Sequence, residues 1–430
     1  MAKESPIVIK NREELIFVLS EASQLEHMIM CQYLFAAFTL KVEPSESLSP
    51  IQLEAVSRWE RNISAIAVQE MIHLSIVSNL LISIGAVPLF YRPNFPQRSK
   101  YYPPSFQLAL LPFGEQALRH FLFLERPEGM ELKDADVFEM LGTTAAPTAT
   151  TENNEIVPEA QDFATVGHLY RGIEQGFRYL VDKYGERKVF IGPPEVQATQ
   201  QDFGWPELIP VTDLQSAVKA IETIVEQGEG ARGNWQEAHY GKFLRIMEEY
   251  HVLKQHEPNF EPARPVIAAY VRQPSDTIEV TTITNPITAR VSDLFNACYE
   301  VLLRLLIRFF VHSGENDDEL QTLCDAAVNS MILVIKPLGH LLSTLPVGPN
   351  APGKTAGPSF EIYRTSYLLP HQETAWLILH ERLLELVNHC EVIRSQLSKT
   401  SKDLVSIEEN LQKLAEALGR HIKGSRNQVP

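Results

Sequence analysis

The sequence has 430 residues, a formal net charge of −16 and 44% hydrophobic residues. Because domains usually hold about 100 to 200 residues, we expect two regions rather than one small core. The acidic charge and the lack of any dense run of Lys or Arg in the sequence argue against a nucleic-acid partner, since a phosphate backbone is bound by basic surfaces.

Cysteine usage and the N-terminal segment indicate a cytoplasmic protein. The chain contains four scattered cysteines, Cys31, Cys298, Cys324 and Cys390. Their lack of any Cys-x-x-Cys pair is typical of reduced thiols rather than of a disulfide framework or a structural zinc site. Residues 1–10 lack the basic flank and apolar run of a secretory signal. The apolar stretch 301–311 contains two arginines and is shorter than the roughly 20 residues of a membrane span, so we expect no membrane association.

Apolar residues recur at three- and four-residue steps, the period of an amphipathic helix, throughout the first part of the chain. The predicted helices are 13–40, 51–84, 166–183, 214–229 and 235–253. Between the second and third of them lies the segment 86–161, rich in proline and aromatic residues, with a short helix predicted near 114–124. Loops of this length usually cover a functional site or remain disordered, and we favour a lid over a site.

A cluster of prolines between residues 258 and 274 marks the boundary between the two predicted regions. A β-branched run at 277–284 predicts a short strand. Four further helices are predicted at 292–312, 317–345, 372–397 and 401–422. The sequence therefore predicts an all-α protein with a helical bundle over 1–257 and a C-terminal helical region over 258–430 packed on it.

Charged residues lie within the apolar faces of the first two helices. Glu26 shares a face with Ala22 and Ile29, and Glu70 and His73 lie one turn apart on the inner face of the second helix. A lone ion in such a place is costly. Four-helix bundles that hold two metal ions supply Glu from two helices and Glu-x-x-His from the other two. The pattern predicts a dinuclear metal centre, and its alternative is a polar pair satisfied within the core.

The third and fourth helices each offer one candidate carboxylate. Glu174 follows Ile173, which belongs to the buried face of the third helix. In the fourth helix, a rotation of about 100° per residue places Glu229 nearer the buried face than Glu226. We therefore predict Glu174 and Glu229 as ligands, with Glu226 left open as a replacement for Glu229.

Helical phase also selects the last histidine ligand. Glu248-x-x-His251 matches the motif by its letters, but Glu248 lies nearly opposite the buried face, which is centred on His239. The predicted metal ligands are Glu26, Glu70, His73, Glu174, Glu229 and His239. Three tyrosines are candidate hydrogen-bond donors to these ligands, with ordinary core packing as the alternative. They are Tyr33, Tyr170 and Tyr240.

The candidate ligands stand in short segments whose order along the chain is specific. The segments are Leu25-Glu26-His27, Glu70-x-x-His73, Tyr170-x-x-Ile173-Glu174, Gln227-Gly228-Glu229-Gly230 and His239-Tyr240-x-x-Phe243. Together they resemble the ferritin-like domain of iminophenyl-pyruvate dimer synthases, which act in violacein- and rebeccamycin-type bisindole biosynthesis. The resemblance continues through the run 356–361 and implies a ferritin-like four-helix bundle. Since the pathway synthases are much longer, it implies a short stand-alone relative.

The ligand set and the resemblance together imply a diiron-carboxylate protein. An oxygen-rich donor set suits two iron ions, with manganese as the alternative, and two ferrous ions can reduce dioxygen together. We expect an oxygen-dependent oxidoreductase that acts on a small aromatic or amino-acid-derived substrate, with no catalytic residue beyond the metal ligands. The alternative is an iron-oxidising, metal-binding or peroxide-scavenging protein without an organic substrate. A homodimer is left open.

Overall fold

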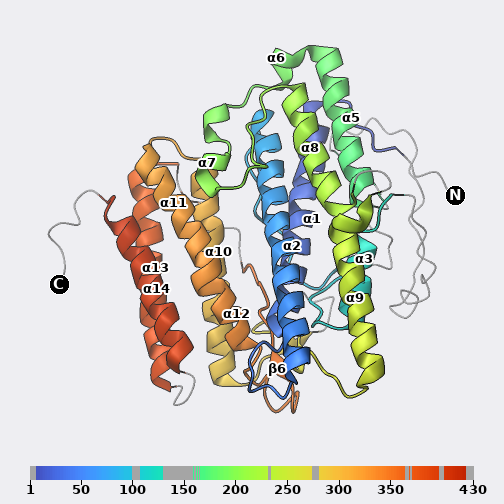
Figure 1. Ribbon diagram of the computed structural model, residues 1–430. Helices are drawn as coiled ribbons and strands as arrows, with labels where there is room; N and C mark the ends of the chain where they lie inside the picture. Colours follow the sequence, from blue (N-terminus) through green and yellow to red (C-terminus); the bar gives the residue numbers. More distant parts are fainter. Residues whose placement is uncertain are drawn as a thin grey trace.

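The computed structural model describes residues 6–98, 107–128, 158, 161, 163, 165–230, 234–273, 280–363, 368, 370–396 and 401–422. The predicted lid over 86–161 therefore lies partly outside the described residues. So do residues 277–279 of the predicted strand. The described part of the chain consists mainly of long helices that lie side by side (Figure 1).

The first two helices form the centre of the bundle and are packed against each other along their length (Figure 1). Helix α1 (Arg12–Thr39) begins after Asn11, whose side chain accepts a hydrogen bond from the backbone N–H of Glu14. Helix α2 (Pro50–Ser83) begins with a reciprocal pair of hydrogen bonds between Ser49 and Gln52. Such caps satisfy backbone N–H groups that have no partner within the helix. Both helices begin within one residue of the predicted positions.

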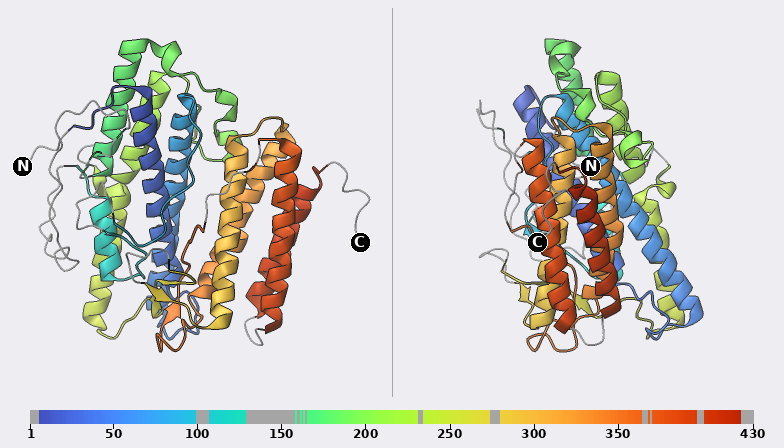
Figure 2. Two further views of the ribbon diagram at one scale, coloured as in Figure 1. Left: turned by 180° about the vertical axis from the view of Figure 1, so that it is seen from behind. Right: turned by 90° about the vertical axis from the view of Figure 1, so that its left-hand side faces the viewer.

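The remaining bundle helices cover the other side of α1 and α2 (Figures 1 and 2). They are α3 (Glu115–Leu124), α5 (Val166–Tyr184), α8 (Leu214–Gly228) and α9 (His239–His256). Short helical turns connect them, namely α6 (Glu186–Val189), η1 (Pro194–Val196), α7 (Gln200–Phe203) and η2 (Trp235–Glu237). The fifth predicted helix thus begins later than expected, because its first turn is the separate 3₁₀ turn η2.

The C-terminal lobe stands beside α1 and α2 on the face opposite α9 (Figure 1). Its helices are α10 (Pro286–Phe310), α11 (Asp317–Ser330), α12 (Lys336–Leu342), α13 (Gln372–Gln396) and α14 (Ser401–Gly419). The π-helical turn η3 (Met331–Ile335) joins α11 directly to α12. The predicted helix 317–345 is therefore one continuous helical segment that contains a π-helical turn. The predicted boundary after residue 257 falls in the loop that follows α9.

Among the described residues, the strands form three pairs of two residues each. Strand β1 (Gln97–Arg98) pairs antiparallel with β2 (Gln107–Leu108), while β3 (Val266–Ile267) pairs parallel with β6 (Thr355–Ala356) and β4 (Ala269–Tyr270) parallel with β5 (Thr281–Thr282). In register, Gln97 faces Leu108, Val266 faces Thr355 and Ala269 faces Thr281. These short ladders tie loops together at the helix ends. The prediction of an all-α protein is confirmed.

One continuous set of buried hydrophobic residues runs from the bundle into the C-terminal lobe, and it includes Trp59 of α2 and Trp376 of α13. Two helical stretches are long and apolar enough to cross a membrane by length and composition, Pro50–Ser83 and Asp317–Leu342. In the first, 78% of the apolar window is buried inside the protein. This burial indicates that α2 is a core helix. Some polar side chains of α2 are buried in the interior of the bundle.

Candidate metal centre

The inner faces of α1 and α2 bring three of the predicted ligands together. Glu26, Glu70 and His73 are each at most 2% exposed. Nδ1 of His73 lies 3.0 Å from Oε2 of Glu70 and 3.5 Å from Oε2 of Glu26. One donor atom from each residue lies within 4.8 Å of the others. This group, the first triad, has the composition and spacing of a metal site.

A second triad shares Glu70 with the first. Nδ1 of His239 lies 2.9 Å from Oε1 of Glu70 and 3.5 Å from Oε2 of Glu125, and again one donor atom from each residue lies within 4.8 Å of the others. Each oxygen of Glu70 therefore faces a different histidine. The imidazole rings of His73 and His239 are stacked with centroids 5.6 Å apart. A carboxylate placed in this way would offer one oxygen to an ion in each triad.

Hydrogen bonds from surrounding side chains orient four members of the two triads. Tyr170 of α5 donates its hydroxyl proton to Glu26, and Tyr33 of α1 donates to Glu125. Nε2 of His73 pairs with Oε1 of Gln227 at 3.0 Å, and Nε2 of His239 pairs with Oε1 of Gln69 at 3.2 Å. With Nε2–H donating to an amide oxygen, Nδ1 of each ring is directed at the carboxylates. Such outer hydrogen bonds fix ring orientation at metal sites.

Charge inside the cluster is balanced by the two imidazoles. Burial raises the pKa of Glu26 to about 7, against the hydrogen bond with His73. Burial also acts on Glu70, but His73 and His239 on either side hold its pKa well below the usual range. The carboxylates in turn raise the pKa of both histidines despite their burial. The charges of the protonated imidazoles thus offset those of the carboxylates, and a divalent cation that binds here would displace these protons.

One buried atom tests whether the cluster fits a metal. Nδ1 of His239 has no hydrogen-bond partner of suitable geometry among the described residues, although Oε1 of Glu70 lies 2.9 Å away. Buried polar atoms without a partner are rare and call for an explanation such as an ion. A cation held between this nitrogen and the carboxylates of Glu70 and Glu125 would satisfy all three. The residues present therefore fit a metal site.

Glu125 is the member of the cluster that sequence reasoning missed. It caps the C-terminus of α3 and is 4% exposed. Leu118, Phe121 and Glu125 follow the three-four spacing of one helix face, and the first two are fully buried. This spacing was the available signal. The sequence places the end of this short helix at Leu124, inside a long loop, and Glu125 lies one residue beyond it.

Glu174 lies outside the cluster. Tyr170, Ile173 and Phe177 form the buried face of α5 as predicted, but the carboxylate of Glu174 is turned outward and pairs with Arg178 one turn later, with an N–O distance of 2.7 Å. One residue beyond Ile173 is a rotation of about 100°, enough to bring the side chain to the surface. Helix α5 contributes Tyr170 to the cluster instead.

Glu229 is buried, as predicted, but at another place. Its two carboxylate oxygens accept hydrogen bonds from the backbone N–H groups of Gly167 (2.6 Å) and Glu128 (3.2 Å). Gly167 belongs to the first turn of α5, so the carboxylate caps the positive end of that helix. Burial raises the pKa of Glu229 to about 7. The alternative, Glu226, is exposed, and α8 reaches the cluster through Gln227.

The choice between two histidines on α9 agrees with helical phase. His239 is fully buried and faces Glu70, whereas the side chain of His251 is 38% exposed and lies 3.8 Å from Glu115 at the surface. Of the three tyrosines considered as donors, Tyr33 and Tyr170 hydrogen-bond to cluster carboxylates. Tyr240 instead packs edge-on against Trp235.

Comparisons with known proteins agree with this architecture. The chain is 29% identical over 407 residues to dichlorochromopyrrolate synthase of Lentzea aerocolonigenes, an alignment that covers 85% of this chain and 38% of that protein. It is 26% identical over 390 residues to 2-imino-3-(indol-3-yl)propanoate dimerase of Chromobacterium violaceum, covering 82% of this chain and 34% of that protein. The chain therefore spans between a third and two fifths of the length of these relatives.

A ferritin-like protein from Caulobacter vibrioides resembles the structure with a TM-score of 0.48 and 17% sequence identity, over 76% of this chain and 96% of that one. The family model described as ferritin-like matches residues 19–248, more than half of the chain. This match contains Glu26, Glu70, His73, Glu125 and His239. The chain belongs to the ferritin-like family.

Proposed function

We propose that this chain is a dinuclear metal-dependent oxidoreductase that uses dioxygen on a small aromatic, amino-acid-derived substrate. The observation that carries the proposal is the position of Glu70, with one oxygen toward His73 and Glu26 and the other toward His239 and Glu125. A structural ion pair has no need of two such triads around one carboxylate.

The donor set favours iron, with manganese as the alternative. Three carboxylates and two imidazoles form the two triads, and none of the four cysteines belongs to them. Oxygen-rich sites with imidazole suit iron and manganese better than ions that prefer thiolates. Two ions, one in each triad, would share Glu70. When bound, a pair of ferrous ions supplies electrons for the reduction of dioxygen.

The residues around the triads position the ligands and exclude water. Tyr170 and Tyr33 each hold one oxygen of a terminal carboxylate, which leaves the other oxygen free for an ion. The ring of Tyr33 packs against Phe121 and Phe243, with centroids 4.7 and 4.9 Å away. This aromatic group closes the cluster on the α3–α9 side, and a dry cavity strengthens every charge interaction within it.

The substrate class is proposed from the relatives. One of them is named for a 2-imino-3-(indol-3-yl)propanoate and the other for a dichlorochromopyrrolate. The two alignments cover 85% and 82% of this chain. We therefore assign an aromatic imino or amino acid as the class of substrate. A cytoplasmic location and a homodimer remain predictions.

A second function, iron oxidation or peroxide removal without an organic substrate, is favoured by one observation. The apolar pocket between α2 and α10 is lined by no member of either triad. This pocket is therefore not the cavity beside the metals that an aromatic substrate would need. Proteins that only oxidise iron need no such cavity.

The test is to load metal-free protein anaerobically with ferrous iron, mix it with dioxygen, and follow the optical spectrum and the products. The reaction is run with and without an indolic imino acid formed in situ from tryptophan by an amino-acid oxidase, with catalase present to remove peroxide. An oxidised or coupled indolic product that forms with the metal-loaded protein, and not with metal-free protein under the same oxidase and catalase, supports the proposal. Ferric product formed at the same rate with or without substrate supports the second function, and the absence of any bound metal after loading refutes both.

A further inference from the structure

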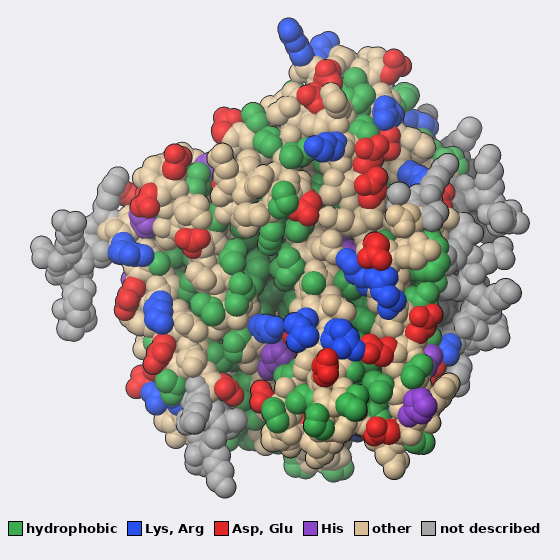
Figure 3. Space-filling view, in the orientation of Figure 1, with side chains coloured by type: hydrophobic (Ala, Val, Ile, Leu, Met, Phe, Trp, Pro, Cys, Tyr) green, Lys and Arg blue, Asp and Glu red, His purple; other side chains and the backbone are tan. Residues whose placement is uncertain are grey.

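An apolar pocket lies between the bundle and the C-terminal lobe, on the side of α1 and α2 that faces away from the metal cluster. Figure 3 shows apolar side chains gathered in a hollow between α2 and α10. Its lining includes Leu74 of α2, Leu303 and Leu306 of α10, and the aromatic rings of Phe203 and Trp205. The hollow is open to solvent at one end. A flat apolar ring is the kind of group that such walls accept.

Polar groups converge at the buried end of the pocket. His27 and Tyr299 line it, and their side chains hydrogen-bond to each other through Nε2 and the hydroxyl. Sγ of Cys31 lies 3.3 Å from the same hydroxyl. The ring of His27 also interacts with the backbone of Phe90, while burial and the charge of Arg92 lower the pKa of His27 well below its usual range. An apolar pocket with a few convergent polar groups is the usual form of a ligand site.

A positive charge stands behind these two residues without a counterion. Arg92 is fully buried, and its guanidinium carbon lies 5.8 Å from the centre of the Tyr299 ring. The guanidinium donates to the backbone oxygens of Phe360 and Pro93, while its Nε has no partner. In the described part of the chain, no carboxylate forms an ion pair with it. Burial disfavours the charge of Arg92, and contacts with Cys31 and Tyr299 raise its pKa; a carboxylate is a stronger partner for a guanidinium.

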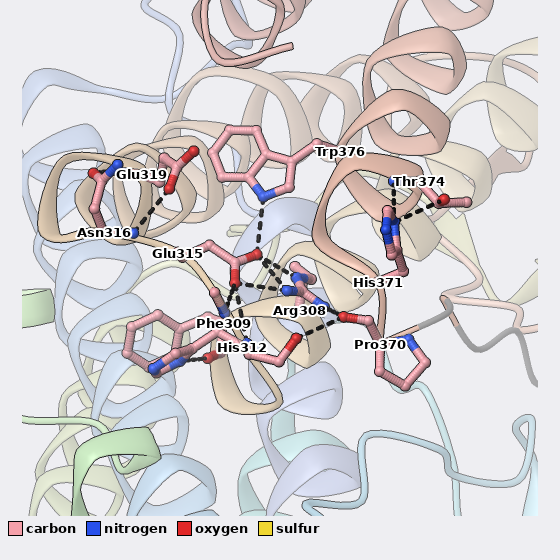
Figure 4. A network of polar contacts seen from close by, with 12 residues as sticks. Arg308, Phe309, His312, Glu315, Asn316, Glu319, Pro370, His371, Thr374 and Trp376 are labelled. Atoms are coloured by element: carbon pink, nitrogen blue, oxygen red, sulfur yellow. Dashed lines mark hydrogen bonds and ion pairs between the residues drawn. The ribbon is translucent and has the colours of Figure 1, made fainter. Parts of the chain in front are cut away.

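The C-terminal lobe shows how the same chain buries an arginine for structural purposes. Arg308, also fully buried, donates Nε and Nη2 to the two carboxylate oxygens of Glu315 and Nη1 to the backbone oxygen of Pro370 (Figure 4). Trp376 donates to the same carboxylate. Arg92 has the backbone partners and lacks the carboxylate. A ligand that reaches the buried end of the pocket can supply it.

Two irregular backbone segments border the same pocket. Phe360, whose ring lines the pocket, has a φ of +50°, a left-handed conformation that is costly for an aromatic residue. The π-helical turn η3 contributes Met331 and Ile335 to the lining. Strained residues and π-turns are retained mainly at functional sites. Both features place side chains in the lining of this pocket.

We propose that this pocket binds a small molecule that joins a flat apolar ring to a carboxylate, with the carboxylate at the His27–Tyr299 end, where it neutralises the charge of Arg92. The pocket has a volume of about 40 Å³ in this structure, so a ring enters when side chains move. Met30, Met71 and Met331 line the pocket, and unbranched methionines adapt readily to a ligand. The site is separate from the metal cluster and does not depend on the proposed oxidation.

The first test uses a matched pair of ligands on the metal-free full chain, by isothermal titration calorimetry. Indole-3-propanoate carries the carboxylate, and indole-3-propanamide has the same shape without the charge. We expect the acid to bind at least tenfold more tightly than the amide. Equal affinity, or no heat with either compound, overturns the proposal. Because no metal is present, failure here leaves the metal-centre proposal intact.

The second test uses variants. Leu306→Trp fills the pocket and is expected to weaken binding of the acid at least tenfold, whereas Leu384→Trp on the exposed face of α13 leaves binding unchanged. Arg92→Gln is expected to abolish the preference for the acid over the amide. If Arg92→Gln does not fold, the comparison of the acid with the amide and the affinity of Leu306→Trp test the proposal instead. Wild-type affinity in Leu306→Trp, or an unchanged preference in folded Arg92→Gln, would show that the ligand lies elsewhere.

Discussion

Replacing Glu125 by Gln should remove one of the two proposed metal ions, because Glu125 is a carboxylate of the second triad and is absent from the first. The amide keeps the size of the side chain and loses its charge. Glu26, Glu70 and His73 remain unchanged, so the first triad keeps all its donors. We expect the stoichiometry of tightly bound ferrous or manganous ion to fall from two per chain to one.

The size of the effect follows from the position of Glu125. Outer hydrogen-bond partners of metal ligands change affinity by about 10- to 100-fold, and a buried direct donor should matter at least as much as the upper value. A 100-fold loss corresponds to about 2.7 kcal/mol, since each tenfold step is about 1.4 kcal/mol. At a free ion concentration about 100 times the wild-type dissociation constant, binding stabilises the fold by about 2.7 kcal/mol, and the variant would retain about 0.4 kcal/mol from that ion.

Two measurements check this expectation, elemental analysis after anaerobic loading and chemical unfolding with and without metal. Glu174→Gln is the matched control, because Glu174 was the carboxylate predicted from sequence and pairs with Arg178 at the surface. It should bind two ions as the wild type does. Full stoichiometry in Glu125→Gln would refute the assignment of Glu125 as a ligand, and loss of an ion in Glu174→Gln would refute the placement of Glu174 outside the cluster.

Three further expectations concern stability. Burial lowers the pKa of His120 to about 3, so between pH 6.5 and pH 3 the unfolded chain binds a proton that the folded chain does not. This difference lowers the free energy of unfolding by about 2 kcal/mol at pH 5. In His120→Leu, the free energy of unfolding in urea should therefore fall less between pH 7 and pH 5. Gly167→Ala places a Cβ within 2.6 Å of the Glu229 carboxylate oxygens and should destabilise by about 1–3 kcal/mol in urea unfolding. Glu315→Gln leaves the charge of Arg308 buried and should cost about 3–5 kcal/mol in calorimetry. A variant as stable as the wild type under these conditions would contradict the corresponding contact.

The parts of the site that were predictable lie on long helices. In α1 and α2 many apolar residues define the buried face, so the direction of Glu26, Glu70 and His73 follows from their spacing alone. His239 was chosen over His251 by the same reasoning, and it is the one that faces Glu70. The rotation of a helix about its axis is well determined when several of its turns bury apolar residues in a core.

Three residues were placed wrongly or missed because helical rotation alone does not determine the position of a side chain. Glu229 is buried as its rotation indicates, yet it caps α5, because rotation about a helix axis says nothing about height along the bundle. Glu174 lies one step from a buried position, where a rotation of about 100° decides between core and solvent. Glu125 belongs to a helix of only ten residues after a proline-rich segment, where the element and its end are hard to place.

The two sites share a wall, and the helical rotation explains how. Glu26 faces the metal cluster and His27, the next residue of α1, lines the apolar pocket on the other side. Glu70 and Met71 are divided in the same way on α2. Since successive side chains differ by about 100°, one pair of helices presents carboxylates to one side and pocket walls to the other. A molecule held in the pocket is thus separated from the metal ligands by the backbones of α1 and α2. Substitutions in the pocket and in the cluster should therefore alter ligand binding and metal binding separately.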